Sequence, residues 1–341
     1  MTSVGCGSGH ESGVSIIMPV RHEGSQLPEV LAAVQAQECL EILVAVGPSR
    51  DDTEQIVRAA AAQDPRLRVL PNPEGIVSTG LNRAIRVARG RQVVRIDGHC
   101  LVPAGFVARL STTAARTGAS CVGPRLQTVG AGPVQEGIAA AMSSALGVGA
   151  ARFRTGATSG YVDTVPFGLY ETAVLLLLGG FREDLVRNQD DELNARLRRA
   201  GGTVYLDADV CVDYYPRATL RSLSRQYYEY GYWRTVTARL HRDRLRPRQL
   251  APGAFVAGLV ATGGLAATGR PAALGLLAAA YAAVLFLLVL QTQRRTGRPI
   301  VAVLSAPAAL VLHLSYGWGL WRSLLRPSIL VPARRPSESR A

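Results

Sequence analysis

The sequence predicts an α/β domain built on a parallel sheet and followed by transmembrane helices. Short apolar runs alternate with helical stretches from Val14 onward, and such continuous apolar strands are typical of parallel sheets covered on both faces. The longest uncharged segments all lie after Leu250, which places a soluble domain ahead of a membrane region. A chain of 341 residues can hold one large domain and an additional segment.

The front half of the chain alternates predicted strands and helices. The predicted strands are V-S-I-I-M from Val14, E-I-L-V-A-V from Glu41, L-R-V-L from Leu67, Q-V-V-R-I-D from Gln92 and A-S-C-V-G from Ala119. Helices are predicted between them, at 27–37, 53–62, 78–89 and 103–117. Because ligands of such sheets bind at the carboxyl ends of the strands, segments 19–23, 47–52 and 97–99 should surround one crevice.

The composition changes after residue 130. Gly130 to Ser159 is rich in Gly, Ala, Ser and Thr, which predicts a mobile loop region, either a loop that covers substrate or plain surface disorder. A charged helix follows from Gln189 to Ala200, ended by two glycines. Two further strands, T-V-Y-L and V-C-V-D-Y, are expected to complete the domain.

The C-terminal third predicts membrane association. Residues 219–246 form a predicted amphipathic helix, aromatic along one face and suited to a membrane surface. An uncharged run at 272–293 is long enough to span, and a shorter run precedes it after Pro252. A third stretch covers 300–321, but three spans would place the Arg-rich tail outside. Two full spans with an interfacial or re-entrant third segment, and three full spans, therefore both remain open.

The formal charge of +13 is concentrated beside these apolar segments. Six arginines between 234 and 248 precede the first stretch and three between 294 and 298 follow the second, which predicts cytoplasmic, lipid-facing flanks. Nucleic-acid binding is not predicted, because zinc-finger spacing, RNA-binding aromatics and a basic heptad helix are lacking. The five cysteines make no C-x-x-C pair and no secretory signal precedes the domain, so we expect a domain in the cytosol.

The first chemical constellation is V-R-I-D-G-H, at the end of a buried strand. Asp97 and His99 lie two residues apart there, and both can face a divalent cation that neutralises a diphosphate leaving group. An equally weighted alternative is an Asp that caps the next helix, next to a surface histidine.

The second constellation is N-Q-D-D-E-L-N, which opens the charged helix. A general base needs a carboxylate directed at a hydroxyl, and Asp190 is our choice because Leu193 and Leu197 define the buried face. Three acids in a first helical turn are also ordinary complements of the helix dipole.

Several motifs occur in an order that resembles glycosyltransferase family 2, in particular the succinoglycan-biosynthesis type. The resemblance covers about Val14 to Tyr230 and the hydrophobic tail. Its motifs are V-S-I-I-M-P-V-R-H-E, I-L-V-A-V-G-P-S-R-D-D-T, S-T-G-L-N-R-A-I, V-V-R-I-D-G-H, F-G-L-Y, G-G-F-R-E-D and N-Q-D-D-E-L-N-A-R-L-R-R-A-G-G.

The resemblance implies a Rossmann-like, GT-A type fold and an inverting, single-displacement transfer from a nucleotide-diphospho-sugar. The residues that it assigns to donor binding are Pro19, Arg21, Glu23, Asn82, Arg83 and Asp97. Asp97 and His99 stand at the metal motif, Asp190 at the catalytic Asp, and Phe167, Gly168 and Asp191 on the sugar and acceptor side. The implied cofactor is a divalent metal, Mn²⁺ or Mg²⁺.

Four positions depart from the family pattern. Val46 stands where the family has an Asp that contacts the base, which leaves the nucleotide unassigned. His99 replaces the last Asp of the metal motif and makes Mn²⁺ at least as suitable as Mg²⁺. Gln189 replaces the Glu before the base. Q-Y-Y-E-Y-G from Gln226 lacks the Q-x-x-R-W motif of polymerising relatives, which favours a single transfer.

We therefore predict a glycosyltransferase of the inner membrane, multi-pass, with a cytoplasmic catalytic domain, acting in polysaccharide or glycolipid synthesis. Its predicted acceptor is a hydroxyl on a lipid-linked or other saccharide, and the alternative is a catalytically silent scaffold in a membrane complex. The predicted divisions are a disordered tail 1–13, catalytic domain 14–218, surface helix 219–250, transmembrane region 251–325 and basic tail 326–341.

Overall fold

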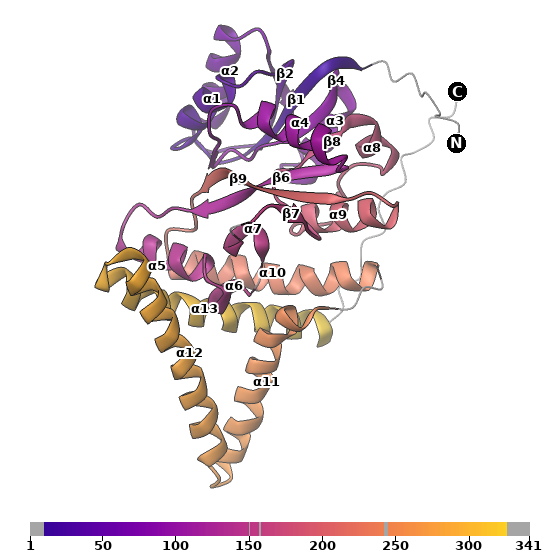
Figure 1. The fold of residues 1–341 in the computed structure, drawn as a ribbon. Coiled ribbons are helices and arrows are strands. Elements are labelled where there is room, and N and C mark those ends of the chain that lie inside the picture. Colours follow the sequence, from indigo (N-terminus) through magenta and orange to yellow (C-terminus); the bar gives the residue numbers. More distant parts are fainter. Residues whose placement is uncertain (1–9, 150, 157, 242–244, 326–341) are drawn as a thin grey trace.

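The structure is a computed structural model that describes residues 10–149, 151–156, 158–241 and 245–325. Within these residues one nine-stranded sheet has the order β3-β2-β1-β4-β8-β6-β9-β5, and β7 pairs with β9 (Figure 1). The strands are β1 (Glu11–Val20), β2 (Glu41–Val46), β3 (Leu67–Pro71), β4 (Gly90–Arg95), β5 (Cys100–Leu101), β6 (Cys121–Thr128), β7 (Gly160–Tyr161), β8 (Leu169–Glu171) and β9 (Val204–Tyr214).

The sheet is mixed rather than parallel throughout. β1 pairs in parallel with β2 and β4, and β2 pairs in parallel with β3. β8 runs antiparallel to both of its neighbours, β4 and β6. β6 pairs in parallel with β9, so the predicted all-parallel sheet is wrong at the short strands β5, β7 and β8, which run antiparallel to their neighbours. β8 follows an irregular segment and needs no crossover helix. The two strands predicted near the end of the domain are one continuous strand, β9.

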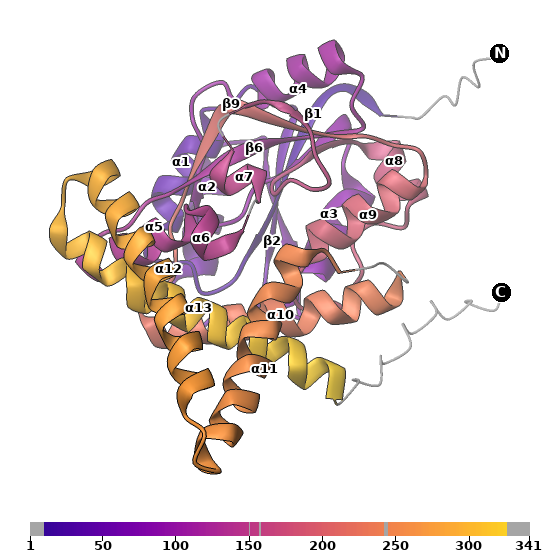
Figure 2. The same ribbon diagram turned by 60° about the horizontal axis from the view of Figure 1, so that its bottom comes forward.

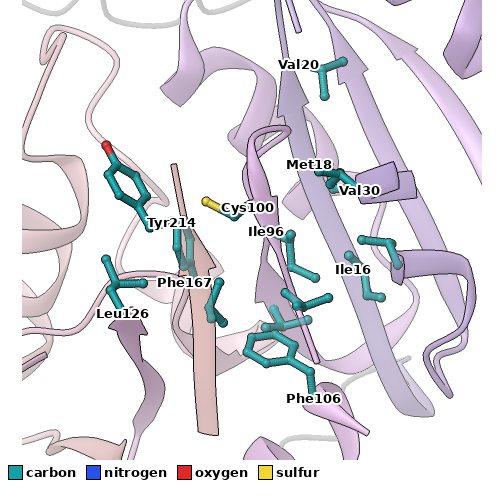
Figure 3. Packing of buried hydrophobic residues seen from close by; sticks show 14 of the residues in the cluster. Ile16, Met18, Val20, Val30, Ile96, Cys100, Phe106, Leu126, Phe167 and Tyr214 are labelled. Atoms are coloured by element: carbon teal, nitrogen blue, oxygen red, sulfur yellow. The ribbon is translucent and has the colours of Figure 1, made fainter. Parts of the chain in front are cut away.

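Helices cover both faces of the sheet. α1 (Leu27–Gln35), α2 (Thr53–Gln63) and α4 (Phe106–Thr117) pack on one face, where Ile16, Met18 and Phe106 are fully buried (Figure 3). The other face is covered by α3 (Val77–Val87), α8 (Thr172–Leu177) and α9 (Gln189–Arg199). This two-sided burial accounts for the apolar strands that the sequence contains.

Two predicted irregular segments are ordered. β1 begins at Glu11, which pairs with Gly90, so the predicted disordered tail is wrong for its last residues, while residues 1–9 lie outside the described part. The predicted mobile loop region instead forms α5 (Pro133–Met142), α6 (Ala145–Val148) and α7 (Arg152–Thr155). Its small residues permit close helix packing: a Cβ on Gly137 would lie 2.7 Å from the Cβ of Leu304.

The C-terminal helices form a base and a projecting hairpin. They are α10 (Leu220–Leu240), α11 (Pro247–Ala267), α12 (Ala272–Thr296) and α13 (Pro299–Leu325). α10 and α13 lie side by side beneath the sheet, and α11 and α12 project away from them as a hairpin (Figures 1 and 2). By length and composition α11, α12 and α13 are each able to cross a membrane.

Three of the arginines that the charge pattern assigned to a lipid-facing flank contact protein groups instead. Arg234 forms an ion pair with Asp191, and Arg246 with Asp163. Arg239 donates hydrogen bonds to the last turn of α13. α10 lies between the domain and α13, so Arg234 and Arg239 reach protein acceptors. Residues 242–244 and the predicted basic tail 326–341 lie outside the described residues.

Candidate active site

The carboxyl ends of β1 and β4 bring the first group of polar side chains together. The backbone N–H of Ile96 donates to the carbonyl of Ile17, which continues the β1–β4 pairing up to Asp97. Gly98 lies against the loop after β1, since a Cβ there would be 3.1 Å from the Cγ of Glu23. The glycine therefore allows the β4 loop to approach the β1 loop closely.

Arg95 connects the two predicted catalytic constellations. Its Nε and Nη2 donate to the two carboxylate oxygens of Asp97 at 2.8 and 3.0 Å, and its Nη1 donates to Asp190 Oδ1 at 2.8 Å. The Arg95 side chain is only 7% exposed. A buried guanidinium between two carboxylates is a strong, directional interaction. The structure thus brings Asp97 and Asp190 together through a residue to which the sequence analysis gave no role.

The two carboxylates have opposite pKa shifts. Burial raises the pKa of Asp190 to about 6, because the nearby Asp97 and Asp191 add to the rise and Arg95 only partly opposes it. Burial also acts to raise the pKa of Asp97, but the bidentate contact with Arg95 outweighs it and leaves that pKa lowered. Asp190 is therefore the more basic of the two carboxylates, as a proton acceptor near neutral pH requires.

His99 is oriented by Glu23. Its Nδ1 lies 3.0 Å from Glu23 Oε1, and its ring makes an edge contact with Tyr214 at 5.8 Å between centroids. Burial lowers the pKa of His99, but the Glu23 carboxylate prevails and the pKa is raised. With Nδ1 held by Glu23, the Nε2 atom is the one available to bind another group.

The residues at this loop fit a metal ion that receives only a few of its ligands from the protein. A histidine whose other nitrogen contacts a carboxylate is the usual arrangement at a metal site. Asp97 supplies a neighbouring carboxylate, although both of its oxygens contact Arg95. Among the described residues no group of three or more His, Cys, Asp and Glu side chains is placed to hold an ion. Asp97 and His99 would therefore need phosphate oxygens or waters to complete the coordination, as is common for Mg²⁺ and Mn²⁺.

The start of α9 orients the second group. Its N-cap, Asn188, has a φ of 63° and donates from Nδ2 to the carbonyl of Tyr230. Leu193 is completely buried, so the helix has the orientation that its apolar pattern predicted. As a result Asp190 faces Arg95, whereas Asp191 faces Arg234 on α10.

Phe167 and Gly168 lie beside Arg95 at the start of β8. The backbone N–H of Arg95 donates to the carbonyl of Gly168 at 3.3 Å. A Cβ at Gly168 would be 2.7 Å from Cys121 Sγ, so only glycine fits this packed position. Phe167 adopts a φ of 51° and lines the cavity described below.

The remaining predicted donor residues lie apart from this group. Arg21 is exposed and donates to the carbonyls of Pro48 and Gly75. Asn82 is buried. Its Nδ2 donates to the carbonyl of Phe181 and to the Glu183 carboxylate, and its Oδ1 accepts from the backbone N–H of Phe181. The other two are Pro19, buried within β1, and Arg83, ion-paired with Glu74. Val46 is buried at the end of β2.

A cavity of about 740 Å³ extends from this site to the C-terminal helices. Arg95, Asp97, His99 and Asp190 line one end, and side chains of α11, α12 and α13 line the other. Sequence reasoning missed the arginines of its wall, which include Arg154 on α7, Arg187 and Arg217. Arg154 lies in the stretch predicted as a loop. The sequence signal available for it was an arginine within an otherwise small-residue segment.

Residues 15–175 match the family model described as glycosyl transferase family 2. The succinoglycan biosynthesis protein ExoA of Rhizobium meliloti (strain 1021) is 33% identical over 320 residues, which cover 91% of this chain and 94% of that protein.

Solved structures support the fold. The mannosyltransferase PcManGT from Pyrobaculum calidifontis, in complex with GDP-Man and Mn²⁺, superposes with a TM-score of 0.56 at 20% identity, over 92% of this chain and 88% of that one. S. aureus TarS 1–349 in complex with UDP-GlcNAc gives 0.53 at 15% identity, over 89% and 90%. The predicted GT-A type fold is confirmed.

Proposed function

Because the chain belongs to glycosyltransferase family 2, we propose that it transfers one sugar from a nucleotide-diphospho-sugar to a hydroxyl acceptor with inversion. The observation that carries the proposal is the position of Asp190, a carboxylate of raised pKa next to Asp97 in one cavity. The likeness to a succinoglycan biosynthesis protein supports a role in exopolysaccharide synthesis. For the acceptor we propose a lipid-linked saccharide, because side chains of α11, α12 and α13 line one end of the cavity.

In the proposed mechanism Asp190 takes the proton of the acceptor hydroxyl as that oxygen attacks the sugar. Arg95 holds this carboxylate in place and stabilises its charged form. Asp97 and His99 would hold a divalent metal, Mn²⁺ or Mg²⁺, which supplies positive charge to the leaving diphosphate. The mannosyltransferase complex with GDP-Man and Mn²⁺ and the TarS complex with UDP-GlcNAc support this donor class.

We further propose that the protein resides in the inner membrane with its catalytic domain in the cytosol. The α11–α12 hairpin carries exposed apolar side chains along its length, such as Val260 and Leu276. α13 lies along α10 rather than along the hairpin, which favours an interfacial third helix over a third span (Figure 1). Under this arrangement the loop with Arg270 faces outward and the Arg294–Arg298 flank inward.

One observation favours the alternative of a silent scaffold. The bidentate contact with Arg95 occupies both oxygens of Asp97, the carboxylate proposed to face the metal. An active enzyme therefore has to exchange part of this contact when donor and metal bind, whereas a scaffold keeps it.

A thermal-shift screen of UDP-, GDP- and dTDP-sugars, with and without Mn²⁺, tests the proposal on the full chain. Ligands that bind the folded state raise the melting temperature by mass action. We expect one nucleotide class to stabilise the protein, and more so with Mn²⁺. Sugar transfer by the wild type and its loss in Asp190→Asn would identify the enzyme. Donor binding without turnover in any acceptor extract would favour the scaffold.

A further inference from the structure

One arginine in the cavity wall has a buried nitrogen without a partner. The Nη1 atom of Arg154, on α7, is buried and makes no hydrogen bond within the part of the chain that the structure describes. Among the same residues no carboxylate lies within ion-pair distance of its guanidinium. Moving a charge out of water costs free energy, which a paired carboxylate normally offsets. The charge of Arg154 is therefore available to an anion that enters the cavity.

The other arginines of the wall show what Arg154 lacks. Five of them have a carboxylate partner: Arg95, Arg187, Arg198, Arg234 and Arg246. Arg217 also lines the cavity, but it is exposed, so water screens its charge. Arg154 differs from these six because its Nη1 atom is both buried and unpaired.

Two aromatic rings hold the guanidinium of Arg154. Its Cζ lies 5.0 Å from the centroid of the Tyr214 ring and 5.6 Å from that of the Phe153 ring. An arginine held over ring faces in this way is stabilised without using the N–H groups of its planar fork. That fork is the part of an arginine that binds phosphate oxygens. The rings thus fix the position of Arg154 and leave donors free for a phosphate.

Tyr214 connects Arg154 to the loop that carries the proposed metal ligands. The ring of His99 makes an edge contact with the same tyrosine, at 5.8 Å between centroids. Arg154, Asp97 and His99 line one cavity with Asp190, whereas the other residues assigned to donor binding lie outside it. The phosphates of a bound donor would therefore enter the cavity beside Asp97 and His99, with the sugar toward Asp190.

Contacts with the sheet and with the C-terminal helices fix the segment that carries Arg154. α7 packs against β6 and β9 on the side of the sheet that faces α10 (Figure 1). Just before it, Ser144 Oγ donates to Gln291 Oε1 of α12 at 2.7 Å, and His313 Nε2 of α13 lies 2.9 Å from the carbonyl oxygen of Gly147. A cation that is already in position stabilises developing charge without the cost of reorganisation.

We propose that Arg154 binds the β-phosphate of the donor and stabilises the nucleoside diphosphate as it leaves. When the acceptor oxygen bonds to the sugar, the bond between the sugar and the β-phosphate oxygen breaks, and its electron pair stays on that oxygen. The acceptor proton goes to Asp190, and the N–H groups of Arg154 donate to the phosphate that gains charge. This inference rests on the proposed function and adds a catalytic residue that lies outside the family motifs.

Nucleotide binding to the full chain in a neutral detergent tests the role of Arg154. Calorimetry with Mn²⁺ compares UDP, GDP and dTDP with UMP, GMP and dTMP. We expect Arg154→Gln to bind the diphosphate that the wild type prefers at least tenfold more weakly. Its affinity for the matching monophosphate should stay within twofold, because that nucleotide lacks the β-phosphate. Equal weakening of both nucleotides, or an unchanged affinity for the diphosphate, would overturn the proposal.

Two further variants show whether the guanidinium or its segment is responsible. Arg152 lies on the same helix, is exposed outside the cavity and donates to the carbonyls of Thr158 and Tyr161. Arg152→Gln should therefore leave diphosphate affinity within twofold of the wild type. Arg154→Lys keeps the charge without the fork, so it should bind the diphosphate at least threefold more tightly than Arg154→Gln. Equal losses in Arg152→Gln and Arg154→Gln would contradict the assignment.

The melting temperature without nucleotide separates a binding role from a structural one. Removing an arginine that supports the fold lowers the melting temperature, whereas removing an unpaired charge from a binding site leaves it unchanged or raises it. We expect the second result for Arg154→Gln. Arg154→Met, which keeps more of the apolar contact with Tyr214 and Phe153, repeats the binding comparison if Arg154→Gln lowers the melting temperature.

The same measurements separate this inference from the proposed function. A wild type that binds none of the six nucleotides would count against both. A wild type that binds a nucleoside diphosphate, with equal affinity in Arg154→Gln, would count against the role of Arg154 alone.

Discussion

The two ends of the candidate site are built in different ways. At the β4 end the contacts are local or join neighbouring strands: Arg95 contacts Asp97 two residues away, and His99 contacts the loop after β1. At the α9 end, Asp191 is held by Arg234 from α10, and Asn188 by a carbonyl of the same helix. The β4 end is therefore a property of the sheet, whereas the geometry around the proposed base depends on helices that pack far along the chain.

α10 packs between α9, the helix that carries the proposed base, and the C-terminal helix α13. Besides Arg234, it supplies Glu229, which pairs with Arg187, while His241 just beyond its end contacts Glu192. On its other side α10 packs on α13 at backbone distance, because a Cβ on Gly231 would lie 2.0 Å from the carbonyl of Tyr316. Damage to the sheet end should therefore affect donor and metal, and damage to the helix end should affect catalysis with donor binding intact.

The largest effect is expected at the base itself. Asp190→Asn keeps the shape of the side chain and loses its basicity, so we expect kcat to fall by about 10²–10⁴-fold. Donor affinity, measured by thermal shift, should stay nearly unchanged. Asp191→Asn is the matched control, because Asp191 faces Arg234, and it should retain most of the turnover. The reverse result would move the base by one residue.

Arg95 is the contact that joins the two ends. Arg95→Met leaves two partly buried carboxylates without their buried cation, and breaking such a pair costs at most about 3–5 kcal/mol of stability. The pKa of Asp190, already about 6, should rise further because its nearest positive charge is gone. A carboxylate of higher pKa ionises only at higher pH, so the acid limb of kcat/KM should move upward. The pH–rate profile and the melting temperature measure both effects.

Arg95→Lys is the control for that prediction. It keeps the charge but cannot contact both carboxylates with a planar fork. We expect its acid limb to remain near that of the wild type while turnover falls. An acid limb that is identical in Arg95→Met and the wild type would show that Asp190 does not control the rate.

Donor binding tests the sheet end separately. Glu23→Gln removes the carboxylate that orients His99, and such partners of metal ligands typically contribute about 10–100-fold in affinity. We expect the affinity for Mn²⁺, measured by thermal shift, to fall at least tenfold in this variant. Its kcat at saturating Mn²⁺ should change little. Glu38→Gln, at an exposed position, is the control. Unchanged Mn²⁺ dependence in Glu23→Gln would argue against His99 as a ligand.

The contrast between the β4 end and the α9 end of the site explains which of its contacts could be predicted from the sequence. Asp97 and His99 follow a buried strand, and Asp190 lies in the first turn of a helix whose leucines define its inner face, so strand ends and periodicity indicated where these three side chains lie. The contact between Arg95 and Asp190 spans 95 residues and depends on how α9 crosses the sheet, which has no local signal. Arg234 was assigned to the membrane because charge next to an apolar run is the usual flank pattern. Only the packing of α10 reveals that it faces a carboxylate.

A modest effect confined to catalysis is expected from the α10–α13 contact, where the comparison between the two ends is tested most directly. A Cβ on Gly319 would lie 2.1 Å from the carbonyl of Tyr228, so Gly319→Ala must move α13 away from α10. Overpacking of this kind costs about 1–3 kcal/mol. Because α10 holds Asp191 beside the base, kcat should fall a few-fold while the donor affinity and the Mn²⁺ dependence stay unchanged. Gly275→Ala is the matched control, since a Cβ there meets nothing within 4 Å. A loss of donor affinity equal to the loss of kcat would mean that the two ends respond as one unit, and the division between sheet and helices would be wrong.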